Sequence, residues 1–135
     1  MKALLSILCL TMLATACQQE TLNIEAPYRV KLQVYTPDVA LRARQAQPLM
    51  LDLRTDSYYK QYGYRLMYYQ QSGLGRLFRD TTAIRQRMPV EIPLGQSRWS
   101  FIPETTGINE VILIAQQERG YTRPDTLHIR FQVNP

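Results

Sequence analysis

The side chains that could take part in acid–base or nucleophilic chemistry are few and widely spaced. His128 is the only histidine among the 135 residues, so the chain can build neither a His-based triad nor a histidine-rich metal site. The carboxylates are scattered, and no pair has a spacing that forces a general acid and a general base together. The main ones are Asp52, Asp56, Glu104, Glu110 and Asp125. We therefore predict that the protein is not an enzyme, with no catalytic residues, no metal ion and no other cofactor.

Cys17 is the residue best placed to form a covalent bond. Lys2 is followed by an apolar run that begins at Ala3, and the small residues Ala14-Thr15-Ala16 stand directly before the cysteine. A basic start, an apolar run and small residues are the pattern of a secretory signal. The run is shorter than the roughly 18 residues that a permanent transmembrane helix needs. The small residues before Cys17 resemble a lipobox, in which the cysteine thiol takes a diacylglycerol through a thioether. We expect residues 1–16 to be a signal peptide and Cys17 to carry the lipid of a bacterial lipoprotein.

Lipidation would leave the mature chain without a free thiol. The sequence has two cysteines, and Cys9 would leave with the signal peptide. No disulfide, thiol nucleophile or thiolate metal site would then be available downstream of Cys17. Several acyl chains on one residue anchor a protein far more firmly than a single chain does. We expect a protein anchored to a membrane of the cell envelope, and Gln18-Gln19-Glu20, which lacks an aspartate beside the lipid, favours the outer membrane.

Tyrosine is the unusual residue of the chain. Of nine tyrosines, six lie within twelve residues. These are Tyr58, Tyr59, Tyr62, Tyr64, Tyr68 and Tyr69. Tyrosine is enriched at partner surfaces and can stack on sugars, but it also has a high strand propensity. Because Tyr64 and Tyr68 fall on an inward face, we expect them in the core. Tyr58, Tyr59 and Tyr69 fall off that face and are the candidate partner interface.

The elements that position these residues are strands with apolar residues at every second position. Expected strands centre on residues 28–35, 49–54, 64–69, 74–78, 88–94, 99–102, 111–115 and 127–133. We expect 64–69 and 74–78 to form a hairpin, and the two prolines of 88–94 to confine that strand to an edge. The nearly continuous apolar run 111–115 predicts the central strand. Seven or eight short antiparallel strands without a helical period predict an all-β, immunoglobulin-like β-sandwich after the signal peptide.

Length and charge favour a single domain that does not bind nucleic acid directly. Residues 17–27 are polar and lack periodicity, which is typical of a tether, and residues 28–135 suffice for one core. Removal of Lys2 with the signal leaves 15 basic against 11 acidic side chains, a net charge of +4. The basic residues form no block of five or six like charges of the kind found in nucleic-acid arms. We therefore interpret the charge as that of a solvated surface.

The chain resembles a known family over nearly its whole length. The similarity rests on Ala26-Pro27-Tyr28-Arg29-Val30, on Tyr64-Arg65-Leu66-Met67-Tyr68-Tyr69-Gln70 leading to Gly73-Leu74-Gly75, on Trp99-Ser100-Phe101 before Ile112-Leu113-Ile114-Ala115, and on Phe131-Gln132-Val133-Asn134. These segments resemble the TraQ-like conjugal transfer proteins of Bacteroides-type conjugative transposons. The chain departs from that pattern at Glu118-Arg119-Gly120-Tyr121, where glycine precedes the aromatic residue, and in the unmatched segment 76–96. The resemblance implies a cell-envelope accessory of conjugative DNA transfer, with other proteins of the transfer apparatus as partners and no catalytic or ligand residues to carry over.

Two functions from different classes therefore remain open. One is a non-catalytic binding or assembly module of a transfer apparatus. The alternative is a carbohydrate- or substrate-binding lipoprotein of an outer-membrane nutrient uptake system, and the fold does not decide between them. An exposed Trp or Tyr flanked by amide and carboxylate side chains would favour a sugar ligand. The single tryptophan, Trp99, alternates into the predicted core instead.

Overall fold

The computed structural model describes residues 28–36, 40–56, 63–118 and 122–135. The expected signal peptide, Cys17, the tether, Tyr58 and Tyr59 lie outside these residues. The described part of the chain contains eleven strands and no helix, which confirms the all-β prediction. Among these residues no helix is long and apolar enough to span a membrane.

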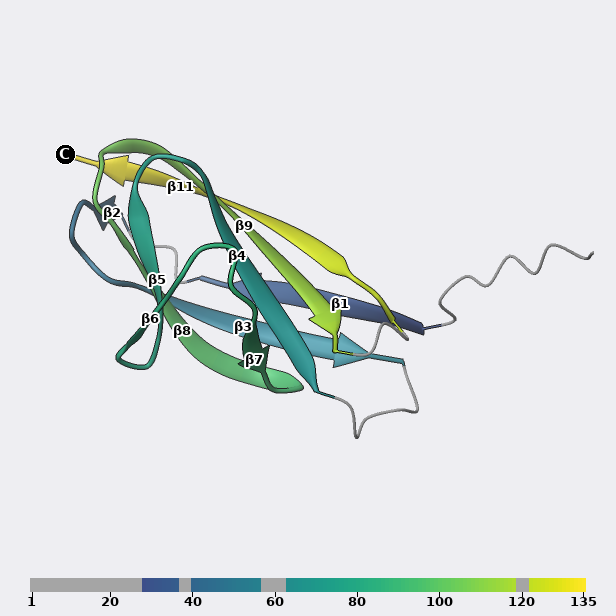
Figure 1. Cartoon of the computed structure of the whole chain (residues 1–135). Helices are drawn as coiled ribbons and strands as arrows, with labels where there is room; N and C mark the ends of the chain where they lie inside the picture. The colour runs from purple at the N-terminus through teal and green to yellow at the C-terminus, as the bar shows by residue number, and fades with distance from the viewer. Residues whose placement is uncertain (1–27, 37–39, 57–62, 119–121) are drawn as a thin grey trace, which may run out of the picture.

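The strands form two sheets that pack as a sandwich (Figure 1). One sheet has the order β10 (Thr122–Arg123), β1 (Tyr28–Tyr35), β3 (Gln47–Thr55), β8 (Gly95–Pro103), β5 (Gly75–Arg79), β6 (Thr82–Ile84). The other has the order β2 (Leu41–Arg42), β11 (Asp125–Asn134), β9 (Gly107–Gln117), β4 (Tyr64–Ser72), β7 (Val90–Ile92). All pairings are antiparallel except the two-residue contacts of β10 with β1 and of β2 with β11. The described strands thus form two layers, each with an inner and an outer face.

The core lies between the two sheets and consists of the inward residues of each alternating strand. Leu51, Leu66, Leu77 and Leu113 are fully buried. Phe101 of β8 stacks on Phe131 of β11, with ring centroids 4.9 Å apart, and so joins the two layers. Because side chains point to opposite faces at successive strand positions, the period-2 pattern identified Leu51 and Leu66 as inward, whereas Leu113 lies in a run that is apolar on both faces.

Two further predictions about strand position are confirmed. β9 is the middle strand of the five-stranded sheet, between β11 and β4. β7 lies at the edge of the same sheet, where Pro89 and Pro93 flank it without removing donors from an interior ladder.

The predicted hairpin of residues 64–69 and 74–78 is wrong, since β4 pairs with β7 and β9 whereas β5 pairs with β6 and β8. The connection at Gly73-Leu74 therefore carries the chain from one sheet to the other. Gly73 has a φ of 72°, and a Cβ there would overlap the buried Asn109 side chain. The strand count also exceeds seven or eight, because β2, β6 and β10 are two- or three-residue strands that are too short to produce a periodic signal.

Candidate partner interface

The outer face of the five-stranded sheet carries apolar side chains on its central strand. Along β9, Val111, Leu113 and Ala115 point into the core, whereas Ile112 and Ile114 point outward and are half-buried. Strands that are apolar on both faces are typical of sheets covered on both sides. The described strands form only two layers, so no described strand covers this outer face. The central strand therefore presents isoleucines where a solvated sheet would present polar residues.

The neighbouring strand β4 extends this apolar surface. Tyr69 lies opposite Ile112 in the register, and Met67 lies opposite Ile114. Both side chains are half-buried, and the Tyr69 hydroxyl donates a hydrogen bond to Met67 Sδ at 3.7 Å. We call Met67, Tyr69, Ile112 and Ile114 the outer apolar patch. Met67 and Tyr69 belong to residue types that are enriched at the centres of protein interfaces.

Charged and polar side chains surround the outer apolar patch. Arg65 of β4 forms an ion pair with Glu118 at 2.7 Å, and Arg130 of β11 pairs with Glu110 of β9 at 3.8 Å. His128 lies opposite Ile112 on the third strand and is exposed, as the sequence predicted. An apolar centre with a polar rim is the arrangement found in protein–protein interfaces. The outer apolar patch and the ion pairs around it therefore have the composition of an interface centre and its rim.

Of the three tyrosines predicted for the interface, the structure places Tyr69 in the outer apolar patch. Tyr58 and Tyr59 lie outside the described residues. Tyr64 and Tyr68 are in the core, 3% and 1% exposed, as expected. Sequence reasoning missed Ile112 and Ile114. The signal was present in the uninterrupted run 111–115, which indicated a central strand but did not show that one side of it is uncovered.

Tyr68 is a buried ionisable group directly beside the patch residue Tyr69. Its hydroxyl donates to Gln70 Oε1 and lies 3.4 Å from the carbonyl oxygen of Gly75. Burial, which disfavours the phenolate, raises the pKa of Tyr68 to about 12, and the negative charge of Glu104 adds to this effect. The group is neutral at physiological pH and acts as a hydrogen-bonded core residue.

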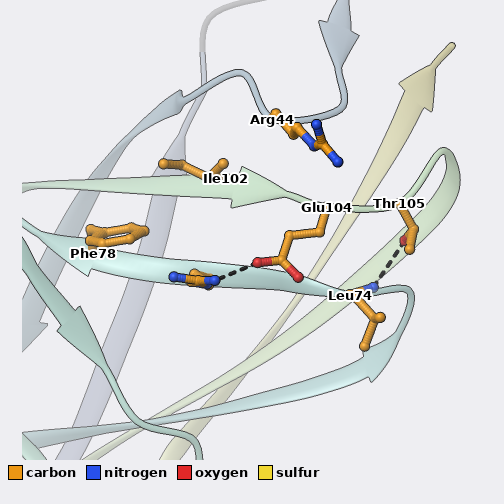
Figure 2. Close-up of a pocket in the computed structure, with 7 residues that line it drawn as sticks. Arg44, Leu74, Phe78, Ile102, Glu104 and Thr105 are labelled. Carbon is orange, nitrogen blue, oxygen red and sulfur yellow. Dashed lines mark hydrogen bonds and ion pairs between the residues drawn. The ribbon is translucent and has the colours of Figure 1, made fainter.

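A hollow lies on the outer face of the other sheet, beside β5 and β8 (Figure 2). Its volume is about 560 Å³, and it is lined by Arg44, Leu74, Arg76, Phe78, Ile102, Glu104 and Thr105. Arg76 Nε donates to Glu104 Oε1 at 2.8 Å, and the Leu74 amide donates to Thr105 Oγ1 at 3.0 Å. This described lining contains neither Trp nor Tyr. Trp99 is 3% exposed and its Nε1 donates to Ser97 Oγ at 2.7 Å; together with the exposed Tyr35 it lines a second, smaller hollow of about 350 Å³.

Among the described residues, no group of three or more His, Cys, Asp or Glu side chains is arranged to hold a metal ion. No protein-family model and no curated protein matches the sequence.

The structure is similar to solved structures of Bacteroides proteins. A conjugative transposon lipoprotein from Bacteroides eggerthii is 15% identical, with a TM-score of 0.63 over 79% of this chain and 98% of that one. A lipoprotein from Bacteroides thetaiotaomicron is 19% identical, with a TM-score of 0.67 over 85% and 88%. A conjugate transposon protein from Bacteroides vulgatus is 16% identical, with a TM-score of 0.64 over 84% and 91%. Such identities establish structural likeness, so this chain has the β-sandwich fold seen in Bacteroides conjugative transposon lipoproteins.

Proposed function

We propose that this protein is a non-catalytic accessory of conjugative transfer that Cys17 anchors to the outer membrane. In this proposal the outer apolar patch binds another protein of the transfer apparatus. The observation that carries the proposal is the pair of outward isoleucines, Ile112 and Ile114, on a sheet face that no described strand covers. The shared fold with conjugative transposon lipoproteins supports the cellular setting.

The lipid tether suits a domain that acts by contact alone. A partner confined to the same membrane meets the patch at a raised effective concentration. Tyr69 and Met67 supply a large contact area, and removal of a central aromatic residue from such an interface costs on the order of 2 kcal/mol, about 30-fold in affinity. The patch therefore accounts for binding without any group that turns over a substrate.

The proposal is tested by deleting residues 20–135 in a host that carries the element. We expect the frequency of transfer to fall while growth is unchanged. Wild-type protein with its lipid should restore transfer better than a version without it. Normal transfer combined with lost growth on a particular glycan would instead support the nutrient-uptake function and refute the transfer function.

Variants of the patch then locate the contact. The double variant Tyr69→Ala/Ile112→Thr removes apolar surface but retains a β-branched residue on β9, so we expect a stable sandwich and reduced transfer. The matched control is Leu94→Ala, which truncates a 37% exposed leucine outside the patch and should transfer normally. A separate Tyr58→Ala/Tyr59→Ala variant tests whether these two tyrosines belong to the same interface. Wild-type transfer by the Tyr69→Ala/Ile112→Thr protein would show that the patch is not the contact.

A further inference from the structure

Basic side chains gather on the outer face of the six-stranded sheet. Exposed cationic residues on this face are Arg29, Lys31, Arg54, Arg76, Arg98 and, from the β2–β3 turn, Arg44. Arg123 of β10 lies beside Arg29 in the register. We call this surface the basic face. Among the described residues of this face the carboxylates are Asp52, Asp56 and Glu104, so positive charge is in excess there. On the opposite side of the sandwich, Arg65 and Arg130 are balanced by Glu110 and Glu118.

Three cations of the basic face form no ion pair with a described residue. Arg54 pairs with Asp52 at 3.1 Å and Arg76 with Glu104 at 2.8 Å. Asp56 accepts a hydrogen bond from the Arg29 backbone amide at 2.7 Å. Lys31, Arg44 and Arg98 form no ion pair with any described residue. A surface of this kind attracts an extended anionic partner.

Two hollows on the basic face place arginine beside apolar walls. In the hollow of Figure 2, Arg44 lines the same space as Phe78 and Ile102. In a second hollow of about 350 Å³, Arg98 adjoins Met50 and Tyr35, and Tyr35 is 53% exposed. Guanidinium groups bind phosphate bidentately, and tyrosine favours the boundary between headgroups and acyl chains. These hollows match a ligand that joins a phosphate to an apolar moiety.

The position of the tether indicates that the anionic partner of the basic face is a membrane. The basic face begins on β1, whose first residue, Tyr28, directly follows the eleven residues 17–27. Such a segment spans at most about 40 Å when extended, so the face stays within reach of the bilayer. We propose that the basic face docks on anionic phospholipid headgroups of the membrane that holds Cys17. This inference rests on the anchor in the proposed function, and it turns the outer apolar patch away from the bilayer toward its partner.

The test uses the full-length, lipid-modified protein in nanodiscs of phosphatidylethanolamine with or without phosphatidylglycerol. Since no cysteine follows Cys17, a single thiol can be introduced as a reporter. Gln96→Cys lies on the basic face, and Gln132→Cys lies on the opposite face; both parent side chains are exposed. We expect phosphatidylglycerol to slow maleimide labelling of the Gln96→Cys protein at least about fivefold, the effect of roughly one basic residue at an anionic surface. The Gln132→Cys protein should label equally in both discs.

Charge variants establish the cause of protection. Adding Lys31→Gln and Arg98→Gln to the Gln96→Cys protein should abolish most of the protection, whereas Arg65→Gln and Arg130→Gln, which remove the same charge from the opposite face, should not. About 1 M NaCl, where the Debye length is about 3 Å, should also release the face. Equal labelling of the Gln96→Cys protein in both kinds of disc would overturn the proposal. Protection by a DNA duplex in discs without phosphatidylglycerol, and none by phosphatidylglycerol itself, would overturn it in favour of nucleic acid.

Failure of the anchor gives a different result from failure of the docking. A protein without acyl chains would not enter the discs, which would refute the lipid on Cys17. In that case the same variants are floated with vesicles of the two compositions. Salt-sensitive flotation with phosphatidylglycerol that is lost in Lys31→Gln/Arg98→Gln supports the docking, and flotation that is equal with both vesicles overturns it.

Discussion

Tyr68 and Tyr69 are neighbours in the chain but have opposite roles, because successive side chains of a strand point to opposite faces. Tyr68 is 1% exposed and packs in the core, whereas Tyr69 contributes to the outer apolar patch. The burial that makes Tyr68 structural also makes its ionisation costly. Tyr69 stays half-buried at the outer face because only one side of its sheet is covered by described strands.

The raised pKa of Tyr68 predicts how the stability of the fold depends on pH. The phenol stays protonated up to about pH 12 in the folded protein but only to about 10.0 when unfolded. The contribution of Tyr68 to the free energy of unfolding should therefore be fully present below pH 10 and be lost between pH 10 and 12, by on the order of 2–3 kcal/mol. Urea unfolding across this range measures the slope. Tyr68→Phe should flatten it and Tyr69→Phe should not; an unchanged slope in the Tyr68→Phe protein would contradict the assignment.

At the level of elements, the connection between β4 and β5 decides how the two sheets are joined. Gly75 follows this connection and lies against the fully buried Phe101 ring, so a Cβ at position 75 would overlap that ring and lie 3.0 Å from the Ile102 carbonyl oxygen. Gly95 differs, because it has a φ of 84° with open space where a Cβ would be. One glycine is thus required by packing and the other by backbone conformation.

These two glycines predict different responses to the same substitution. Gly75→Ala should destabilise the protein by about 1–3 kcal/mol through overpacking, and Gly95→Ala by about 1–2 kcal/mol through left-handed backbone strain. Phe101→Leu frees space at position 75, so in a double-mutant cycle it should couple favourably to Gly75→Ala but not to Gly95→Ala. The measurement is chemical denaturation of all single and double variants. Absence of coupling at Gly75 would mean that the ring is not the obstacle.

At the level of the whole molecule, one lipid at Cys17 would place a sandwich with two unlike faces at a membrane. Cys17→Ser should yield an unprocessed chain without acyl groups, since a serine hydroxyl cannot form the thioether. Metabolic labelling with a palmitate analogue, followed by measurement of the protein mass, checks both features. Incorporation of the analogue into the Cys17→Ser protein would show that another residue carries the lipid.

The sequence by itself determined the longer strands and, where apolar and polar residues alternate, their inward faces. Apolar residues such as Leu49, Leu51 and Leu53 alternate because burial in a sheet repeats every two residues, and this signal is local. The edge position of β7 was readable for a similar reason, since proline affects the hydrogen bonds of its own strand. The sequence also showed, without coordinates, that the chain has few side chains suited to catalysis, since it contains one histidine and no cysteine after Cys17.

Only the tertiary structure decided which strands pair and which outer surfaces are brought together. The passage of the chain from β4 to β5 between sheets depends on contacts of Gly73 and Gly75 with residues distant in sequence, Asn109 and Phe101. Arginines and a lysine that are scattered along the chain meet on one face because strand order places β1, β3, β8 and β5 side by side. Ile112 and Ile114 are outward because the described strands place the second layer on one side of β9 alone. Periodicity records which residues share a face, whereas long-range pairing determines what that face meets.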